Sequence, residues 1–365
     1  MERQEKAALC MLHSIKGIGN RSLIKIKHDF NSYTEFLQLD ASQLRTRALL
    51  PPLVLEEVLI LRKRFQPMPF LEELEGRDIR IMTLEEDSYP RSLRNISNPP
   101  AVLYCRGSLE DAGNFSLAVV GCRAATRYGK HTARELARSL ADCGVNVVSG
   151  MARGIDREAH LGALEGNGFT VAVLGSGMDV VYPREHIQLY EQICREGLVI
   201  SEFPPSVPPE PRNFPMRNRI ISGLAQGVIV VEARMKSGAL ITADFALEQG
   251  KDVFAVPGPI NSMASAGTNN LIKQGAIVYT EIMDIIQEYQ VLEDIFPAPG
   301  VKQEELLLLD KEESVIMESM SCDPCHFDKL LTITGFDIGQ LSSLLLNLEL
   351  RGIVQSLPGN YYVKL

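Results

Sequence analysis

The sequence predicts an α/β protein built on a parallel, doubly wound sheet, and two observations support this. From residue 116 to about residue 280, short apolar runs rich in valine and isoleucine alternate with longer segments of helical periodicity. Nearly every apolar run ends in a glycine-containing loop, as strands do at the ligand-binding edge of such sheets. A chain of 365 residues has room for two or three domains, so we expect smaller modules beside the sheet.

The predicted core strands are continuous β-branched or apolar runs, which is typical of strands buried on both faces. They are 117–120, 145–148, 170–174, 198–201, 228–231, 253–256 and 277–279. The predicted helices between them are 129–143, 155–165, 185–196 and 240–249. Strands that alternate with helices pair in parallel, which gives the doubly wound sheet.

The strongest indication of a binding site surrounds the strand at 228–231. After the strand come Lys236, Ser237 and Gly238, and then a helix that opens near Ala239. A basic Gly/Ser loop at a helix N-terminus offers free backbone N–H groups and the positive end of the helix dipole to an anion. Arg217 and Arg219 precede the strand and add forked donors. We therefore predict a phosphate site rather than solvated surface charge.

Other loops are expected to meet at the same edge of the sheet. Basic side chains follow three of the strands, so Arg123, Arg153 and Lys236 converge with Arg217. None of the loops is a G-x-G-x-x-G or a P-loop, so we expect no cofactor and no metal. Phe214 either stacks on a base or packs in the core. Asp156 and His160 lie four residues apart on one helix, but an aspartate there more often supports the helix N-terminus than catalysis.

The N-terminal segment is predicted to be a helical module. Residues 7–65 are helical in pattern, and the Gly17-Ile18-Gly19 turn is similar to a helix-hairpin-helix, which offers backbone N–H groups to DNA phosphates. A small packing module is an equal alternative. Pro67 and Pro69 are expected to end it. A short strand at 79–83 and another within 99–107 then connect to the core.

The C-terminal segment is predicted to be a separate module behind an acidic linker. From Glu281 to Glu313 there are ten acidic residues and two basic ones. Helical patterns at 314–320, 327–332 and 338–350, followed by a hairpin over 352–363, predict a winged helix. The third helix carries no Lys or Arg, which favours packing or protein contact over reading DNA bases.

Composition limits the remaining classes. No apolar run approaches the roughly 20 residues of a membrane helix, and the charged N-terminal residues do not resemble a signal peptide. Seven cysteines then predict reduced thiols in the cytoplasm, and we expect the Cys322–His326 pattern, C-x-x-C-H, to be free thiols rather than a haem or zinc site. A net charge of −9 argues against coating nucleic acid through bulk charge, but it allows a local basic groove.

These motifs together resemble one family, the bacterial DNA-processing protein A, also called DprA or Smf. The resemblance spans about residues 80–280. It rests on Tyr89-Pro90, Pro99-Pro100, Gly121-Cys122-Arg123, 149–156, 172–179, Tyr182-Pro183, 201–205, 214–224, 231–233, 236–243 and 253–258.

The resemblance implies an architecture and a function. The architecture is a sterile-alpha-motif-like domain over 1–70, an extended Rossmann-like core over 71–290, a linker over 291–309 and a winged helix over 310–365. Such proteins are not enzymes: they bind incoming single-stranded DNA, protect it, and help load the recombinase RecA during natural transformation. They act as homodimers through the core.

The resemblance also implies the residues of the DNA pocket. Carried over by motif, they are Arg123, Arg153, Phe214, Arg217, Asn218 and Lys236, with the loop residues Gly121, Gly150, Gly175, Ser237 and Gly238. Cys122 and Arg153 depart from the residues that many members carry, which leaves the individual contacts open. For the dimer, an apolar strand and helix at the sheet edge invite a twofold partner. The expected interface residues are Leu271, Ile272, Ile277, Ile282 and Ile285.

One competing class is an enzyme. Lysine-decarboxylase-like phosphoribohydrolases have a related sheet and hydrolyse nucleotides, and their P-G-G-x-G-T-x-x-E motif places a glutamate at a helix start. The nearest equivalent in this chain, residues 266–271, has no glutamate at that place. The sequence therefore favours a binding protein over a hydrolase.

Overall fold

The structure is a computed structural model, and it describes residues 1–47, 49–109, 114–289, 292, 311–320, 325–350, 353–357 and 359–364. The chain divides into two compact units, Met1–Phe296 and Pro297–Leu365. The predicted linker over 291–309 lies outside the described residues except for Leu292, and so does Cys322 of the C-x-x-C-H pattern.

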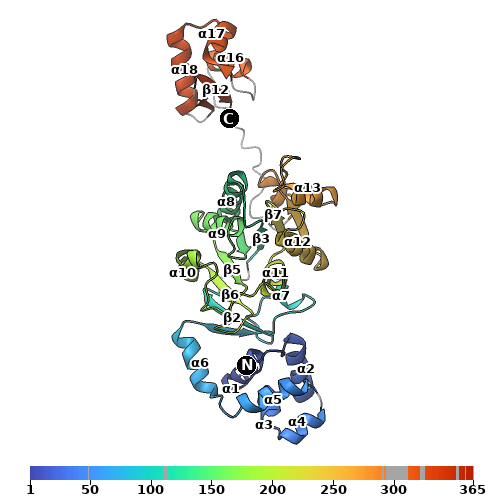
Figure 1. Cartoon of the computed structure of the whole chain (residues 1–365). Coiled ribbons are helices and arrows are strands. Elements are labelled where there is room, and N and C mark those ends of the chain that lie inside the picture. The colour runs from blue at the N-terminus through green and yellow to red at the C-terminus, as the bar shows by residue number, and fades with distance from the viewer. Residues whose placement is uncertain are drawn as a thin grey trace. The chain divides into compact units, whose positions relative to one another are not determined.

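Within the described part of the first unit, nine strands form one sheet in the order β1-β2-β6-β5-β4-β3-β7-β8-β9 (Figure 1). The strands are β1 Arg80–Thr83, β2 Val102–Gly107, β3 Ser116–Val120, β4 Asn146–Ser149, β5 Thr170–Leu174, β6 Leu198–Ser201, β7 Gly227–Val230, β8 Asp252–Ala255 and β9 Ile277–Val278. All pairs from β6 to β9 are parallel, which confirms the predicted sheet.

Two strands at one end of the sheet run the other way. β2 pairs antiparallel with β6, placing Tyr104 opposite Ser201, and β1 pairs antiparallel with β2. These are the strands that the sequence assigned to a connecting section, and their pairing extends the sheet toward the N-terminal helices.

The strand order reverses at β3. The chain proceeds from β3 through β4 and β5 to β6, then returns so that β7 pairs with the opposite side of β3. The loops after β3 and β7 therefore leave the sheet in different directions. This divergence creates the crevice in which open α/β sheets bind their ligands.

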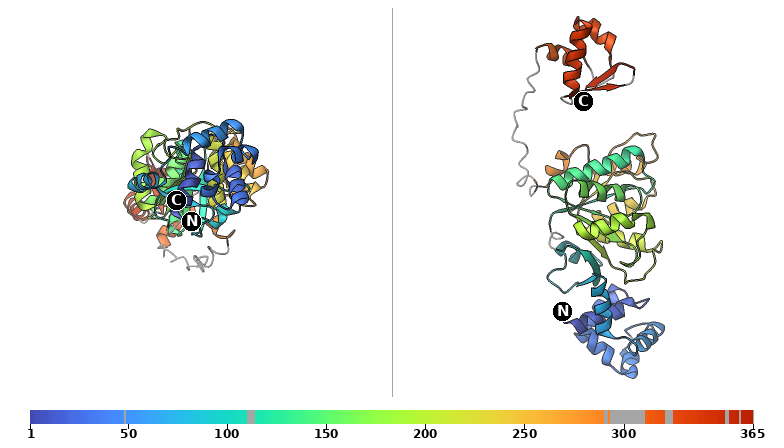
Figure 2. Two further views of the ribbon diagram at one scale, coloured as in Figure 1. Left: turned by 90° about the horizontal axis from the view of Figure 1, so that it is seen from below. Right: turned by 90° about the vertical axis from the view of Figure 1, so that its left-hand side faces the viewer.

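Alternate residues of the strands face two helical layers. Leu117 and Val119 pack with α8 (Arg127–Asp142) and α9 (Ile155–Glu165), whereas Ala118 and Val120 pack with α11 and α12. α11 spans Asn213–Leu224 and α12 spans Gly238–Glu248. The two layers lie on opposite sides of the strands in Figure 1, and α8 and α9 face the viewer in the right-hand view of Figure 2.

The sequence missed α11, which lies beside the crevice. Its residues from Arg217 to Leu224 are all buried, polar and apolar alike. Without an exposed polar face, the segment lacks the amphipathic pattern by which helices are recognised in a sequence. The predicted helices at 155–165, 185–196 and 240–249 correspond to α9, to α10 (Ile187–Glu196) with the short turn before it, and to α12.

The N-terminal module contains α1 Arg3–Ser14, α2 Asn20–Phe30, α3 Tyr33–Gln38, α4 Ala41–Arg47, α5 Pro52–Leu61 and α6 Pro67–Gly76. The prediction that Pro67 and Pro69 end this module was wrong, because they open α6. Proline is tolerated in the first turn of a helix, where the backbone N–H has no partner to lose. The expected boundary at residue 70 thus falls inside a helix.

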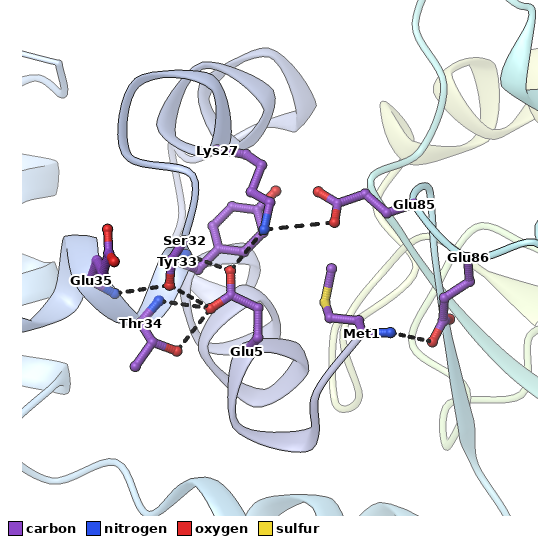
Figure 3. Close-up of polar contacts among 9 residues, drawn as sticks. All are labelled: Met1, Glu5, Lys27, Ser32, Tyr33, Thr34, Glu35, Glu85 and Glu86. Carbon is purple, nitrogen blue, oxygen red and sulfur yellow. Dashed lines mark hydrogen bonds and ion pairs between the residues drawn. The ribbon is translucent and has the colours of Figure 1, made fainter.

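The carboxylate of Glu5, in α1, caps the N-terminus of α3 (Figure 3). Glu5 accepts hydrogen bonds from the backbone N–H groups of Tyr33, at 2.7 Å, and Thr34, at 3.1 Å. Lys27 pairs with the same carboxylate at 3.1 Å. Although burial opposes the shift, the backbone and hydroxyl donors lower the pKa of Glu5 to about 2. The N-terminus of α3 is therefore satisfied within the protein.

The second unit has the predicted winged-helix content. Its helices are α16 Lys311–Ser319, α17 Phe327–Thr334 and α18 Ile338–Leu350. The wing is antiparallel, in the order β10-β12-β11, from Cys325–His326, Tyr361–Lys364 and Val354–Leu357. Leu341, Leu345 and Leu348 of α18 are buried, so its leucine-rich face forms the core of the unit. No helix in the described ranges has the length and apolar character needed to cross a membrane.

Candidate nucleic-acid interface

A groove of about 540 Å³ opens at the point where the strand order reverses. The loops after β3, β4 and β7 contribute to its walls, together with α11 and the first turn of α12. Eight of the predicted site residues line it: Gly121, Arg123, Phe214, Arg217, Asn218, Lys236, Ser237 and Gly238. A smaller pocket beside the groove is lined by the other three, Gly150, Arg153 and Gly175. Arg123 and Phe214 line both.

The rim between the two cavities is aromatic and cationic. The Arg123 guanidinium lies 4.9 Å from the centre of the Phe214 ring. The centre of the Tyr182 ring lies 5.6 Å from the centre of the same Phe214 ring. Arg123 is exposed, and Tyr182 is 39% exposed. Rings beside an accessible guanidinium can stack on bases while the cation holds a phosphate. Tyr182 was absent from the predicted site residues, although the loop after β5 that contains it also contains Gly175.

Glycine at position 175 is required by this aromatic arrangement. A Cβ atom added to Gly175 would lie 2.9 Å from a ring carbon of Phe214. The resemblance placed Gly175 among the loop residues of the DNA pocket. In the structure the space is taken by Phe214, which is half-buried, so Gly175 positions the ring.

Arg217 lies in the floor of the groove and is only 3% exposed. Its Nη1 donates to the carbonyl oxygen of Gly150 at 2.7 Å and to that of Val173. These carbonyls lie at the ends of β4 and β5, so the guanidinium ties two neighbouring strand ends together. Burial lowers the pKa of Arg217 to about 10, although the nearby Asp156 carboxylate opposes the shift. The predicted phosphate donor is thus largely committed to backbone oxygens.

Asp156 and Asn218 complete the floor. The Asp156 carboxylate is buried and accepts a hydrogen bond from the backbone N–H of Ala152 at 3.4 Å. Burial raises its pKa, against the influence of Arg217. Asn218 accepts from Arg217 Nε at 3.2 Å and donates to the carbonyl of Gly238 at 3.2 Å. The floor is therefore a connected polar network that positions α11 against α12.

The opposite wall is the loop before α12. Lys236 is exposed, and among the residues that the structure describes its ammonium group has no hydrogen-bond or ion-pair partner. Ser237 caps the helix, since its Oγ accepts from the N–H of Ala239 at 3.3 Å. A Cβ at Gly238 would meet open space. The wall thus presents a free cation beside the N-terminus of α12 within the described structure.

Two other arginines are engaged elsewhere. Arg153 is exposed, but its guanidinium forms two hydrogen bonds with the Glu185 carboxylate, at 2.7 and 2.8 Å. Arg219 is buried and pairs with Glu202, away from the groove. Arg234, by contrast, is exposed and lines the groove. The free cations of the groove are accordingly Arg123, Arg234 and Lys236 within the described structure.

The residues predicted for a dimer interface divide into two groups. Leu271 is 5% exposed and Ile285 is fully buried, so both side chains belong to the core of this chain and cannot form an external surface. Ile272, Ile277 and Ile282 are partly buried and lie against that core. β9, which contains Ile277, is the last strand of the sheet.

The residues considered for catalysis are arranged for structure. His160 is fully buried, and its Nδ1 contacts Thr170 Oγ1 at 2.7 Å, while that hydroxyl donates to the Val147 carbonyl. Leu271 occupies the place where the phosphoribohydrolases carry a glutamate, and it packs in the apolar core. In the described ranges no group of three or more His, Cys, Asp or Glu side chains is arranged to hold a metal ion.

A Rossmann-like sheet with a cationic and aromatic groove, joined to a winged-helix unit, defines a protein of the DNA-handling class. The family model for DNA recombination-mediator protein A matches residues 80–290, and that for the DprA winged-helix domain matches residues 300–360. The chain belongs to the DprA family of DNA-processing proteins.

Relatives and solved structures agree with this assignment. Protein Smf of Escherichia coli is 40% identical over 79% of this chain and 78% of its own length. The X-ray structure of DNA processing protein A from Streptococcus pneumoniae matches with a TM-score of 0.68 and 32% identity, over 78% of this chain and 98% of that one. The protein from Helicobacter pylori, described for its single-stranded DNA binding mode, matches with a TM-score of 0.53 and 31% identity, over 59% of this chain and 97% of that one.

Proposed function

We propose that this protein binds single-stranded DNA, without base specificity, in the groove at the strand reversal. The observation that carries the proposal is the rim, where the free guanidinium of Arg123 lies 4.9 Å from the Phe214 ring centre beside the accessible ring of Tyr182. Aromatic rings tolerate any base, and the cations contact phosphates, which every sequence presents. The Helicobacter pylori relative, described for binding single-stranded DNA, supports the same assignment.

The family supports a wider role for such binding. We propose that the protein acts in the cytoplasm, protects incoming single strands and loads the recombinase RecA on them during transformation or recombination. DNA held by its phosphates and stacked on two rings keeps most base edges free for pairing. A strand-exchange assay on single strands coated with a single-strand-binding protein, run with and without the protein described here, tests the loading step. An unchanged rate of recombinase assembly on those strands would contradict the proposal.

The binding step is tested by a competition titration with a single strand and a duplex of the same sequence and length. We expect preference for the single strand, because bases stacked in a duplex cannot reach Tyr182 and Phe214. Equal affinity for both forms would contradict the proposal. A nucleotide-hydrolysis assay on the same preparation tests the alternative enzyme class, for which we expect no turnover.

We also propose that the chain forms a homodimer through the end of the sheet at β9. β9 is an edge strand, and Val278 on it is 40% exposed. The loop before α13 (Ala266–Lys273) exposes Ile260 almost completely, and Met263 to 73%. Exposed apolar side chains beside a free strand edge favour a twofold partner. A monomer mass by light scattering at micromolar concentration would contradict the dimer.

A further inference from the structure

A second groove, of about 680 Å³, lies between the Gly17-Ile18-Gly19 turn and the core segment 202–216. One wall is the turn and the start of α2, and the other is the loop that follows β6 and leads into α11. The side chains that matter for its chemistry are Lys16, Asn20, Arg21, Glu202 and Arg212. The assigned functions use none of these residues.

The N-terminus of α2 opens into this groove without a cap. Its N-cap is Gly19, which has no side chain, and residues 19–22 all line the groove. Within the described ranges, no acceptor contacts the backbone N–H groups of Asn20, Arg21 or Ser22. The N-terminus of α3, in contrast, is closed by Glu5 and Ser32 (Figure 3). The open N–H groups favour an anion supplied from outside.

Charge in the groove favours the same ligand. Lys16 and Arg21 are exposed, and neither forms an ion pair with any residue in the described part of the chain. The acidic side chains are already paired, Glu210 with Arg212 and Glu202 with Arg219. The free charge is therefore positive and sits beside the unpaired N–H groups.

A buried network fixes the groove and leaves one acceptor free. Asn20 donates to Glu202 at 2.7 Å and accepts from the backbone N–H of Ala101 at 3.0 Å, which ties α2 to the core. Glu202 is only 5% exposed, lines the groove, and its Oε2 has no hydrogen-bond partner within the described structure. The polar network is thus incomplete within the described structure, at an acceptor whose residue borders the groove.

The two grooves lie on opposite sides of one short segment. Pro209 and Pro211 line the core groove, whereas Pro208 and Arg212 line the second. We propose that a single strand leaving the core groove crosses this segment and places a backbone phosphate on the N-terminus of α2, between Lys16 and Arg21. This inference rests on the proposed single-strand binding and extends its site into the N-terminal module.

The substitution Gly19→Asp tests the proposed phosphate contact, and it removes no contact within the protein. Gly19 has φ −102° and ψ 177°, which any residue adopts, and a Cβ there meets open space. The introduced carboxylate caps the N–H groups of α2 and takes the place of the phosphate, so the melting temperature stays level or rises. Gly19→Ala leaves the N–H groups open, and Gln4→Glu adds the same charge in the first turn of α1, at the other end of that helix from the groove.

Binding is measured by fluorescence anisotropy with an oligothymidylate length series. For strands long enough to span both grooves, we expect Gly19→Asp to bind roughly tenfold more weakly than either control, with a log-affinity against log-salt slope shallower by about 0.7. Strands that fill only the core groove should bind all four proteins equally.

Two results would overturn the inference. One is equal binding of long strands by Gly19→Asp and Gly19→Ala. The other is a loss that is the same at every length. If the unaltered protein binds neither short nor long strands, the proposed function itself fails, and that result is distinguishable from the first two.

Discussion

The floor and the rim of the core groove contain the same residue type in opposite situations. On the floor, Arg217 is buried and donates to the carbonyl oxygens at the ends of β4 and β5. On the rim, Arg123 is exposed and lies against the Phe214 ring, and its guanidinium has no hydrogen-bond or ion-pair partner among the described residues. Both arginines lie at the carboxyl edge of the sheet, and the sequence assigned both to phosphate binding.

The difference teaches that position at a functional edge does not determine what an arginine does. A guanidinium whose donors already have protein acceptors gains little from a phosphate, since the exchange replaces one hydrogen bond with another. A guanidinium without such acceptors gains the whole contact. We therefore expect mutations on the floor to act on stability and mutations on the rim to act on binding.

Replacing Arg217 should give the largest effect. Arg217→Ala leaves the Gly150 and Val173 carbonyls without their donor and the buried Asp156 carboxylate without its cation. We expect a loss of about 3 kcal/mol in the free energy of unfolding. Thermal unfolding followed by circular dichroism measures it, with Arg123→Ala as the matched arginine control. A melting temperature unchanged in Arg217→Ala, with binding abolished, would reverse the assignment of floor and rim.

Replacing Arg123 should give the next largest effect, on binding alone. Arg123→Ala removes a charge-assisted phosphate contact, so the affinity for single strands should fall by about 1–3 kcal/mol. The slope of log affinity against log salt should become shallower by about 0.7. Salt-dependent titrations and a melting curve on the same variant check this. A large drop in melting temperature with an unchanged slope would mean that Arg123 is structural.

The sequence was sufficient to predict the parallel sheet, but it was insufficient to predict the floor of the site. Continuous runs such as 228–231 are read correctly because burial on both faces leaves a simple apolar pattern. α11 was missed because its buried face includes Arg217, Asn218 and Arg219, which obscure any amphipathic period. The antiparallel pairing of β2 with β6 was also missed, since strand direction follows from connections that composition does not encode.

For the site, the sequence identified the loops but not the partners of each side chain. Arg153 was grouped with the phosphate donors, yet Glu185, 32 positions further along the chain, occupies its guanidinium. Tyr182 lies within a segment that carries the family resemblance, but only the fold brings its ring to 5.6 Å from that of Phe214. Such pairings depend on where loops from separate strands meet, which a single sequence does not show.

Tyr182 sharpens the comparison on the rim, with a smaller effect than Arg123. Tyr182→Ala should weaken single-strand binding by about 1–2 kcal/mol, the range for one lost base-stacking contact. Tyr182→Phe keeps the ring and should bind as the unaltered protein does. Since stacking is not ionic, the salt slope should stay the same in both variants. If Tyr182→Phe loses as much affinity for single strands as Tyr182→Ala does, the hydroxyl rather than the ring makes the contact with DNA.

Lys236 should give the smallest effect, and one that depends on salt. Its ammonium group is exposed and has no partner in the described part of the chain, so removal costs the fold nothing. A mobile point charge contributes mainly by releasing counterions from the DNA, and it lacks the paired donors of an arginine. Lys236→Gln should therefore reduce the salt slope by about 0.7 while the affinity at high salt stays near that of the unaltered protein. Titrations of Lys236→Gln and Arg123→Gln from low to high salt separate the roles of the two cations. The affinity of Arg123→Gln for single strands should remain lower than that of the unaltered protein throughout the range, because this variant also loses a directed contact beside Phe214. A constant deficit for Lys236→Gln at every salt concentration would place its ammonium group in a directed contact as well, and the rim would then hold its phosphates from both walls of the groove.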